Sequence, residues 1–194
     1  MERKRNRNAL RSMNVIMDAY VCLLKETPME KITVTSIVNK AGLNRSTFYA
    51  HFTSPNDVQK MLEQKLVEDF LEALKDFDLD GLMKDPKPFL SAIAERIDMK
   101  MNYVKLMFEK HPASLWLNRL REAVIDKFMS DPNVSNYGDK KLLLIKLRFF
   151  VGGYISLCRD VLSNNISGTL TDLTEILSDT ISAGLNAESS MAHI

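Results

Sequence analysis

The sequence predicts an all-α fold, and three observations lead to this prediction. Glycine and proline, the residues that most often interrupt helices, number only 7 and 6 in 194 residues. Apolar residues recur at three- and four-residue steps along most of the chain, as they do on one face of a helix. The alternating β-branched stretches that strands need are short. We therefore expect about nine helices, arranged as an N-terminal three-helix domain followed by a C-terminal helical bundle.

The first three helices are delimited by their capping residues. A helix is expected from about residue 7 to 26, where the apolar periodicity ends. Thr33 is a good N-cap for a second helix. Gly42 ends that helix, because glycine adopts the left-handed conformation without a Cβ clash. Asn44 can cap a third, short helix over residues 45–51.

The rest of the chain alternates helices with two polar loops. A fourth helix begins at Ser54-Pro55, where serine is a cap and proline suits the first helical position, and it runs to about residue 76. Residues 78–88 contain one glycine and two prolines and are predicted to be a surface loop. Further helices are expected over 89–101, 115–129, 139–163 and 169–185, with a second polar loop at 130–138.

The charge is unevenly divided along the chain. Residues 1–52 contain nine Lys or Arg and four Asp or Glu. The remaining residues contain 17 Lys or Arg and 21 Asp or Glu. A basic N-terminal segment followed by an acidic remainder is typical of a polyanion-binding module joined to another domain. Charge alone is also compatible with an ordinary solvated basic surface.

The composition argues against an enzyme and against a membrane protein. The chain has three histidines, with no Glu-x-x-His pair and no zinc-type spacing, and it lacks a glycine-rich phosphate loop, so neither catalysis nor a metal or cofactor is expected. Cys22 and Cys158 have apolar neighbours and are predicted to be buried thiols in a reducing compartment. The most apolar stretch, 142–162, carries four charged residues, and no signal peptide is recognised, so we expect a cytoplasmic protein.

The functional signal lies in residues 32–52, ITVTSIVNKAGLNRSTFYAHF. Two short helices around a glycine-containing turn are typical of a helix-turn-helix, whose second helix enters the major groove of DNA. Phe48 and Phe52 are expected to point inward and set the angle between the helices. Arginine can bind guanine with two hydrogen bonds, and hydroxyls and imidazoles can reach phosphates or base edges. The side chains of these types on the outer face are Arg45, Ser46, Thr47, Tyr49 and His51.

The same segment resembles a known family. The run Thr33-x-x-x-Ile37-x-x-x-Ala41-Gly42-Leu43-x-x-x-Thr47-Phe48-Tyr49-x-His51-Phe52 is similar to the signature of the TetR family of transcriptional repressors, and the resemblance covers about residues 7–66. It implies that residues 1–53 are the helix-turn-helix DNA-binding domain and residues 54–194 a ligand-sensing and dimerisation domain. It further implies a homodimer that binds a near-palindromic double-stranded DNA operator and is released by a small-molecule effector of unknown identity.

The resemblance also implies roles for single residues. Thr33 and Thr35 would touch the DNA backbone, Arg45 and Ser46 would read bases, and Thr47, Tyr49 and His51 would anchor phosphates. A basic arm on the DNA would consist of Arg3, Lys4, Arg5 and Arg7. The residue types alone are also compatible with two other interpretations: Tyr49 as a packed core residue, and His51 as a donor to carbonyls at a helix end.

One position departs from the family pattern. The family usually has a lysine three residues after the position of Phe52, where it meets a phosphate, but this chain has Pro55 there. Either Thr53, Ser54 or Lys60 replaces that lysine, or one phosphate contact is lost. Loss of one contact would lower the salt dependence of binding by a slope of roughly 0.9.

The two last helices are candidates for a dimer interface. Residues 139–163 are apolar over much of the helix circumference, and Gly152-Gly153 in their middle predicts close approach of another backbone. Together with 169–185 they would supply two helices from each protomer to a four-helix interface, the arrangement that the resemblance implies. A buried central helix within a monomer is the alternative.

The body also carries a candidate ligand pocket. Methionine and aromatic side chains cluster in it, as in adaptable binding pockets, although such residues also fill ordinary cores. A cavity of several hundred Å³ would favour a small-molecule effector. A filled body with an exposed apolar patch would instead favour a regulator controlled by a protein partner. The candidate pocket residues are Met99, Tyr103, Met107, Phe108, Trp116 and Phe150.

Overall fold

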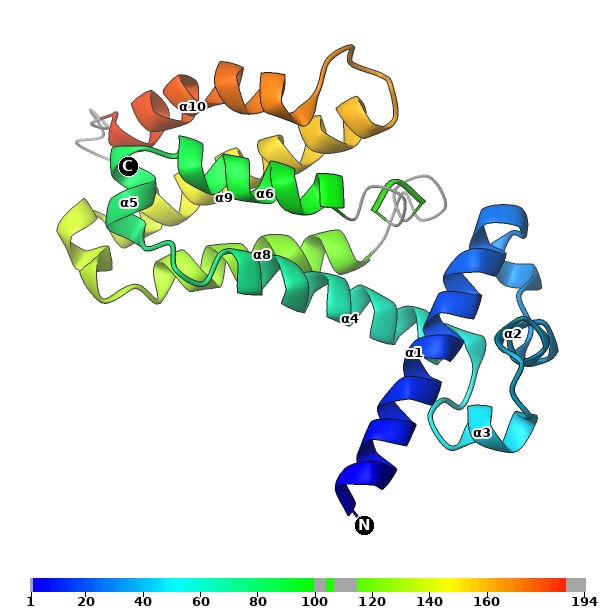
Figure 1. The fold of residues 1–194 in the computed structure, drawn as a ribbon. Helices are drawn as coiled ribbons and strands as arrows, with labels where there is room; N and C mark the ends of the chain where they lie inside the picture. Colours follow the sequence, from blue (N-terminus) through cyan, green and yellow to red (C-terminus); the bar gives the residue numbers. More distant parts are fainter. Residues whose placement is uncertain (1, 100–103, 107–114, 188–194) are drawn as a thin grey trace. The chain divides into compact units, whose positions relative to one another are not determined.

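The computed structural model describes residues 2–99, 104–106 and 115–187, with residues 2–6 and 115 described by their backbone alone. These residues form helices and contain no β-strand, so the predicted all-α fold is confirmed (Figure 1). Among them, no helix combines the length and the hydropathy needed to cross a membrane. The chain divides into two compact units, and the boundary falls inside helix α4, between Leu66 and Val67.

The first unit is a small helical cluster built around helix α1. One face of α1 places Ile16, Tyr20 and Leu24 in the core, each no more than 1% exposed, where α1 packs against α2 and α3. The helix begins before residue 7, because the Glu, Arg and Lys residues at its start are good helix formers. The elements of this unit are α1 (Glu2–Glu26), the 3-10 helix η1 (Met29–Lys31), α2 (Val34–Ala41), α3 (Arg45–Tyr49) and the first part of α4 (Pro55–Ala73).

Two polar groups lie in the core of the first unit. The carboxylate of Glu63 is 5% exposed and accepts a hydrogen bond from Nε2 of Gln59 at 2.8 Å. The hydroxyl of Tyr20 is buried without a hydrogen-bond partner among the described residues. Burial, with the nearby carboxylates of Glu63 and Glu30, raises the pKa of Tyr20 to about 12. The Tyr20 hydroxyl therefore stays protonated and pays a desolvation cost that no hydrogen bond offsets.

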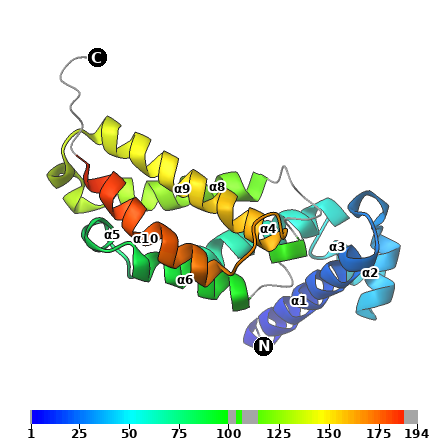
Figure 2. The same ribbon diagram turned by 90° about the horizontal axis from the view of Figure 1, so that it is seen from above.

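The second unit is a helical bundle in which α10 packs against α6 and α9, and α8 packs against α9 (Figure 2). The predicted helix over 115–129 matches α8, and Thr169 caps α10 by accepting a hydrogen bond from the backbone N–H of Asp172. The helical residues 104–106 place Val104 and Leu106 in the core. This unit contains the end of α4 and, in chain order, the helices α5 (Leu79–Lys84), α6 (Lys87–Met99), α8 (Leu115–Met129), η2 (Pro132–Tyr137), α9 (Lys140–Leu162) and α10 (Leu170–Asn186).

The prediction of a surface loop over residues 78–88 was wrong, because this segment contains helix α5. The carboxylate of Asp78 accepts a hydrogen bond from the backbone N–H of Gly81 at 2.7 Å and so caps the helix. Leu79, Leu82 and Met83 are then buried. Three buried apolar side chains in six residues outweigh the low helix propensity of one glycine.

The predicted loop at 130–138 is also partly helical, since it contains η2. The carboxylate of Asp131 accepts hydrogen bonds from the backbone N–H groups of Leu79, at 2.9 Å, and Asn133, at 2.8 Å. The side-chain amide of Asn133 in turn donates to Asp80 at 2.8 Å. The start of α5 and the start of η2 are therefore joined by a small hydrogen-bonded network.

Within the described part of one chain, Gly152-Gly153 makes no close helix contact, so the close approach predicted there stays a prediction for a second chain. Within the described chain a Cβ at Gly153 would meet nothing within 4 Å, and one at Gly152 would meet only the side chain of Arg121, at 4.0 Å. Gly184 of α10 is the glycine that lies tightly against a neighbour, the ring of Phe150 on α9. Among the described residues of one chain, no other helix therefore packs closely against Gly152 and Gly153 of α9.

Helix α9 is not enclosed on all sides by its own chain. Ile145 and Phe149 lie on its exposed face, where Phe149 is 73% exposed, so the alternative of a helix buried inside a monomer is not what the described chain forms. Cys158 of the same helix is buried as predicted, whereas Cys22 in α1 is only half-buried.

Candidate functional site

The segment from α2 to α3 forms a helix-turn-helix whose ends are capped as its sequence predicts. Oγ1 of Thr33 accepts a hydrogen bond from the backbone N–H of Ser36 at 3.1 Å, which closes a capping box at the start of α2. Gly42 ends α2 in the left-handed conformation, with φ of 64°. Asn44 then caps α3 by accepting from the N–H of Thr47 at 2.8 Å. Both helices are therefore held at their ends by short-range interactions.

Phe48 anchors α3 in the core of the first unit. Its side chain is fully buried and lies near the ring of Phe52, with centroids 5.9 Å apart. Phe48 faces inward, whereas Arg45, Ser46 and Tyr49 of the same short helix are exposed. Tyr49 is 57% exposed and touches Phe48 edge to face. Its hydroxyl end is thus available at the surface rather than packed in the core.

Arg45 is held by a side chain of the other helix. Nη2 of Arg45 donates a hydrogen bond to Oγ1 of Thr35 at 2.7 Å, and both residues are exposed. This contact joins the first turn of α2 to the first turn of α3. Part of the guanidinium fork is used in this bond, and the remaining N–H groups are available to an outside acceptor.

The hydroxyls of two residues that are predicted to contact the DNA backbone already form hydrogen bonds at a helix cap. Oγ1 of Thr47 donates to Oδ1 of Asn44 at 2.9 Å, and Oγ1 of Thr33 lies 3.3 Å from Oγ of Ser36. A phosphate that takes the hydrogen of either hydroxyl must replace these bonds. The exposed Ser46 has no such cap role among the described contacts.

His51 contacts a residue that the sequence analysis did not single out. Its Nε2 lies 2.7 Å from Oγ of Ser12 in α1. The Ser12 hydroxyl also lies 3.0 Å from the carbonyl oxygen of Ala9. His51 thus ties the segment after α3 to α1. A serine inside the amphipathic pattern of α1 carries no local signal for this contact.

The start of α4 explains what Pro55 does in this chain. Proline occupies the first helical position, Oγ of Ser54 accepts from the N–H of Asp57 at 3.3 Å, and the carboxylate of Asp57 accepts from Thr53. The Thr53 hydroxyl that donates to it lowers the pKa of Asp57. Of the three residues suggested as replacements for the missing lysine, Thr53 and Ser54 are used in this cap, and Lys60 is exposed.

The basic arm lies within α1. Arg3, Lys4 and Arg5 belong to the first turns of this helix, although only their backbone is described, and Arg7 is exposed. The first unit therefore has basic residues along the start of one continuous helix, and Arg45 of α3 is a further exposed basic residue.

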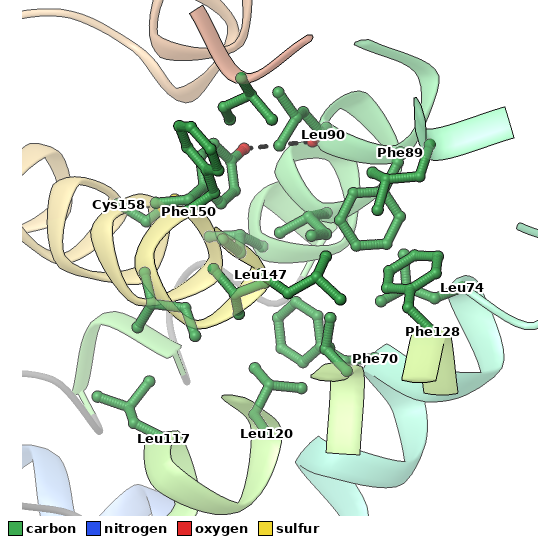
Figure 3. A pocket seen from close by; sticks show the side chains of 18 of the residues that line it. Phe70, Leu74, Phe89, Leu90, Leu117, Leu120, Phe128, Leu147, Phe150 and Cys158 are labelled. Atoms are coloured by element: carbon green, nitrogen blue, oxygen red, sulfur yellow. Dashed lines mark hydrogen bonds between the residues drawn. The ribbon is translucent and has the colours of Figure 1, made fainter. Parts of the chain in front are cut away.

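The second unit contains an apolar cavity of about 70 Å³ (Figure 3). Its wall is built from α4, α5, α6, α8, α9 and α10, with Leu74 and Val104, and includes two of the predicted pocket residues, Trp116 and Phe150. Met99, by contrast, is 74% exposed. The other three predicted residues, Tyr103, Met107 and Phe108, lie outside the described residues. Within the described parts of both units, no three His, Cys, Asp or Glu side chains gather as a metal site.

These observations define the class of fold: a helical chain with an N-terminal helix-turn-helix and a helical body that holds an apolar cavity. A solved structure of this fold is the dihydroxyacetone kinase operon activator DhaS, with a TM-score of 0.64 and 17% sequence identity, covering 90% of this chain and 96% of that chain. At this identity the likeness shows a shared fold. No family model matches the chain, and the comparison with curated proteins found no match. The resemblance to the TetR family stays a prediction.

Proposed function

We propose that this protein is a homodimeric DNA-binding transcriptional regulator that reads a near-palindromic operator with one helix-turn-helix from each protomer. We further propose that it is a repressor released by a small-molecule effector bound in the second unit. The observation that carries the proposal is the pairing of a fully buried Phe48 with an exposed Arg45, Ser46 and Tyr49 on the five-residue helix α3. That arrangement suits a recognition helix, which must be anchored on one face and free on the other.

The dimer is supported by the exposed face of α9. Ile145, Phe149, Gly153 and Ser156 are spaced along one side of this helix and are all exposed in the single chain. The neighbouring helix α10 adds Ile176, which is 69% exposed. Large exposed apolar side chains in a group indicate a contact surface. The open Gly153 would let a second helix approach closely.

The cavity, at about 70 Å³, is smaller than the several hundred Å³ expected of an effector site, so the effector role of the second unit is supported by the position of the cavity and not by its size. Phe70 of α4 and Leu74, the residue that follows α4, line it, and the first turns of α4 pack in the first unit through the buried Val58. A ligand that displaces either side chain therefore acts on the helix that is continuous with the DNA-reading head. For efficient release, the effector must prefer the non-binding state by several kcal/mol.

The DNA-binding part is tested by selecting bound fragments from the source genome and measuring affinity against salt. We expect an inverted repeat, with affinity that falls steeply as salt rises. Arg45→Ala should weaken binding and relax preference at one base pair of each half-site by about 1–3 kcal/mol. Lys84→Ala removes the same charge from the exposed end of α5 and should leave binding unchanged. Weak, sequence-independent binding by the wild type would contradict the proposal.

The dimer is tested by sedimentation of the wild type and of Phe149→Glu. We expect a dimer for the wild type and a monomer for the variant, because a buried unpaired carboxylate is costly. Ile166→Glu places the same charge on an exposed apolar residue between α9 and α10 and should remain dimeric. A monomeric wild type would contradict the dimer and leave the α9 face to a protein partner of another kind.

Activation of transcription is the second candidate for the direction of regulation. The similar structure is named an operon activator, which favours activation over repression if function follows the fold. A reporter placed downstream of the selected operator separates the two. Deleting the regulator raises reporter output if it represses and lowers the output if it activates.

A further inference from the structure

The described wall of the cavity in the second unit contains no side chain that is charged at neutral pH. Among the described residues, its lining includes aliphatic and aromatic side chains from α4, α5, α6, α8, α9 and α10, and no Asp, Glu, Lys, Arg or His is among them (Figure 3). Three lining residues carry a hetero-atom in the side chain: Trp116, Tyr154 and Cys158. All three are neutral in their ordinary protonation state.

The hydroxyl of Tyr154 is already used within the protein. It donates to the backbone carbonyl of Leu90 at 3.3 Å and lies 3.5 Å from Oγ1 of Thr174, whose own hydrogen goes to the carbonyl of Leu170 at 3.0 Å. Burial raises the pKa of Tyr154, so the phenol keeps its proton. The hydroxyl therefore supports the packing of α9 on α6 and has no hydrogen left for a ligand.

The thiol of Cys158 offers no charge either. Burial raises the pKa of Cys158 to about 12, so it remains a neutral thiol. A thiol is a weak hydrogen-bond donor and acceptor and behaves as a small apolar group in a protein core. An ionised ligand would thus find no counter-charge, and a strongly polar one would find few partners.

The size of the cavity limits the ligand as well. Its volume of about 70 Å³ is roughly half that of the apolar cavity of about 150 Å³ that accepts benzene. Phe150, one of its wall residues, is only half-buried, so motion of this ring toward solvent enlarges the space. A short alkyl chain or a single ring is therefore the largest ligand that the described wall accommodates with a local change.

We infer that the effector of the second unit is an uncharged, predominantly hydrocarbon molecule no larger than a single ring with a short substituent. The inference rests on the proposed role of this unit as a sensor. Its physical basis is that transferring apolar surface from water into this wall is favourable, whereas transferring a charge without a partner is very costly.

The single tryptophan of the chain gives a direct readout. Trp116 is 1% exposed and lines the cavity, so its fluorescence reports occupancy there without interference from another indole. The probes are toluene, benzoate and benzylammonium, which share one ring and differ in charge. We expect toluene to change the Trp116 emission saturably and to raise the unfolding temperature. Benzoate and benzylammonium should bind at least a hundredfold more weakly.

Two matched variants place the effect in the cavity. Val151→Phe fills space at a lining residue of α9 and should weaken toluene binding at least tenfold. Leu144→Phe makes a similar change at a half-buried residue of the same helix that does not line the cavity, and it should leave toluene binding unchanged. If Val151→Phe fails to fold, the comparison of the three probes on the wild type still decides the inference.

The outcomes separate this inference from the proposed function. Benzoate or benzylammonium binding as tightly as toluene, or no saturable effect of toluene on Trp116, overturns the inference while operator binding stands. Toluene binding that leaves operator affinity unchanged supports the chemical class of the ligand, and it contradicts release by an occupant of this cavity.

Discussion

The ring of Phe150 on α9 lies directly against the backbone of Gly184 on α10. A Cβ built on residue 184 would overlap Cζ of the ring and lie 2.9 Å from Cε2. The glycine is therefore required by packing rather than by backbone conformation, because its φ lies outside the left-handed region. Since Phe150 also lines the cavity, this one contact determines both the spacing of the two helices and the shape of the cavity wall.

Gly184→Ala should destabilise the protein by about 1–3 kcal/mol, because the added methyl group forces the Phe150 ring or the helix to move. Gly152→Ala is the matched control, since its Cβ would meet only Cδ of Arg121, at 4.0 Å. The control should gain up to about 1 kcal/mol from the higher helix propensity of alanine. Urea unfolding followed by circular dichroism measures both changes. Equal stability of Gly184→Ala and the wild type would show that the ring is not confined by this glycine.

Thr35→Val should weaken operator binding by about 1 kcal/mol, because it removes the acceptor that holds the Arg45 guanidinium. If the two residues act together, the same substitution should cost less in an Arg45→Ala background. Binding titrations of the four proteins at one salt concentration give the coupling. Additive effects would mean that Thr35 contributes independently of Arg45.

Tyr20→Phe should stabilise the first unit by about 1 kcal/mol, because the buried hydroxyl that it removes has no hydrogen-bond partner among the described residues. Tyr154→Phe provides the contrast. Its hydroxyl donates to the carbonyl of Leu90, so its removal should cost about 0.5–1.5 kcal/mol. Thermal unfolding of the two variants checks the opposite signs. A loss of stability in Tyr20→Phe would reveal a partner for this hydroxyl.

Asp57→Asn should make the stability of the first unit less dependent on pH. The hydrogen bonds from Thr53 lower the folded pKa of Asp57 below its ordinary value of 3.8. A lowered folded pKa means that the carboxylate contributes stability above the unfolded pKa and loses it as the pH falls through the folded pKa. The advantage of wild type over variant should therefore be constant near neutral pH and shrink in acid. Unfolding measured across this range checks it, and a constant difference in acid would contradict it.

The elements with strong local signals could be predicted from the sequence. Thr33 and Asn44 act as N-caps and Gly42 takes the left-handed conformation, because each of these roles depends on residues within a few positions. The helix over 115–129 followed equally well from its apolar periodicity.

The features that depend on distant residues could not be predicted. Helix α5 was missed because the glycine and two prolines of residues 78–88 indicated a loop, whereas the burial of the helix and its bond to Asp131 depend on residues far along the chain. The contact from Arg45 to Thr35 joins α3 to α2, and the contact from His51 to Ser12 joins the segment after α3 to α1. No sequence pattern predicts either pair. For the cavity, residue type indicated aromatic candidates, but only the fold shows that Trp116 and Phe150 line it while Met99 is exposed.

The hydrogen-bonded network at Asp131 has a consequence for local motion. Neither α5 nor η2, each six residues long, has enough turns to be stable alone. Because one carboxylate accepts from the backbone of both, opening either element removes a partner from the other. The two should therefore open together as one cooperative segment, and the amide hydrogens of Leu79 and Asn133 should exchange with solvent deuterium at the same free energy of opening.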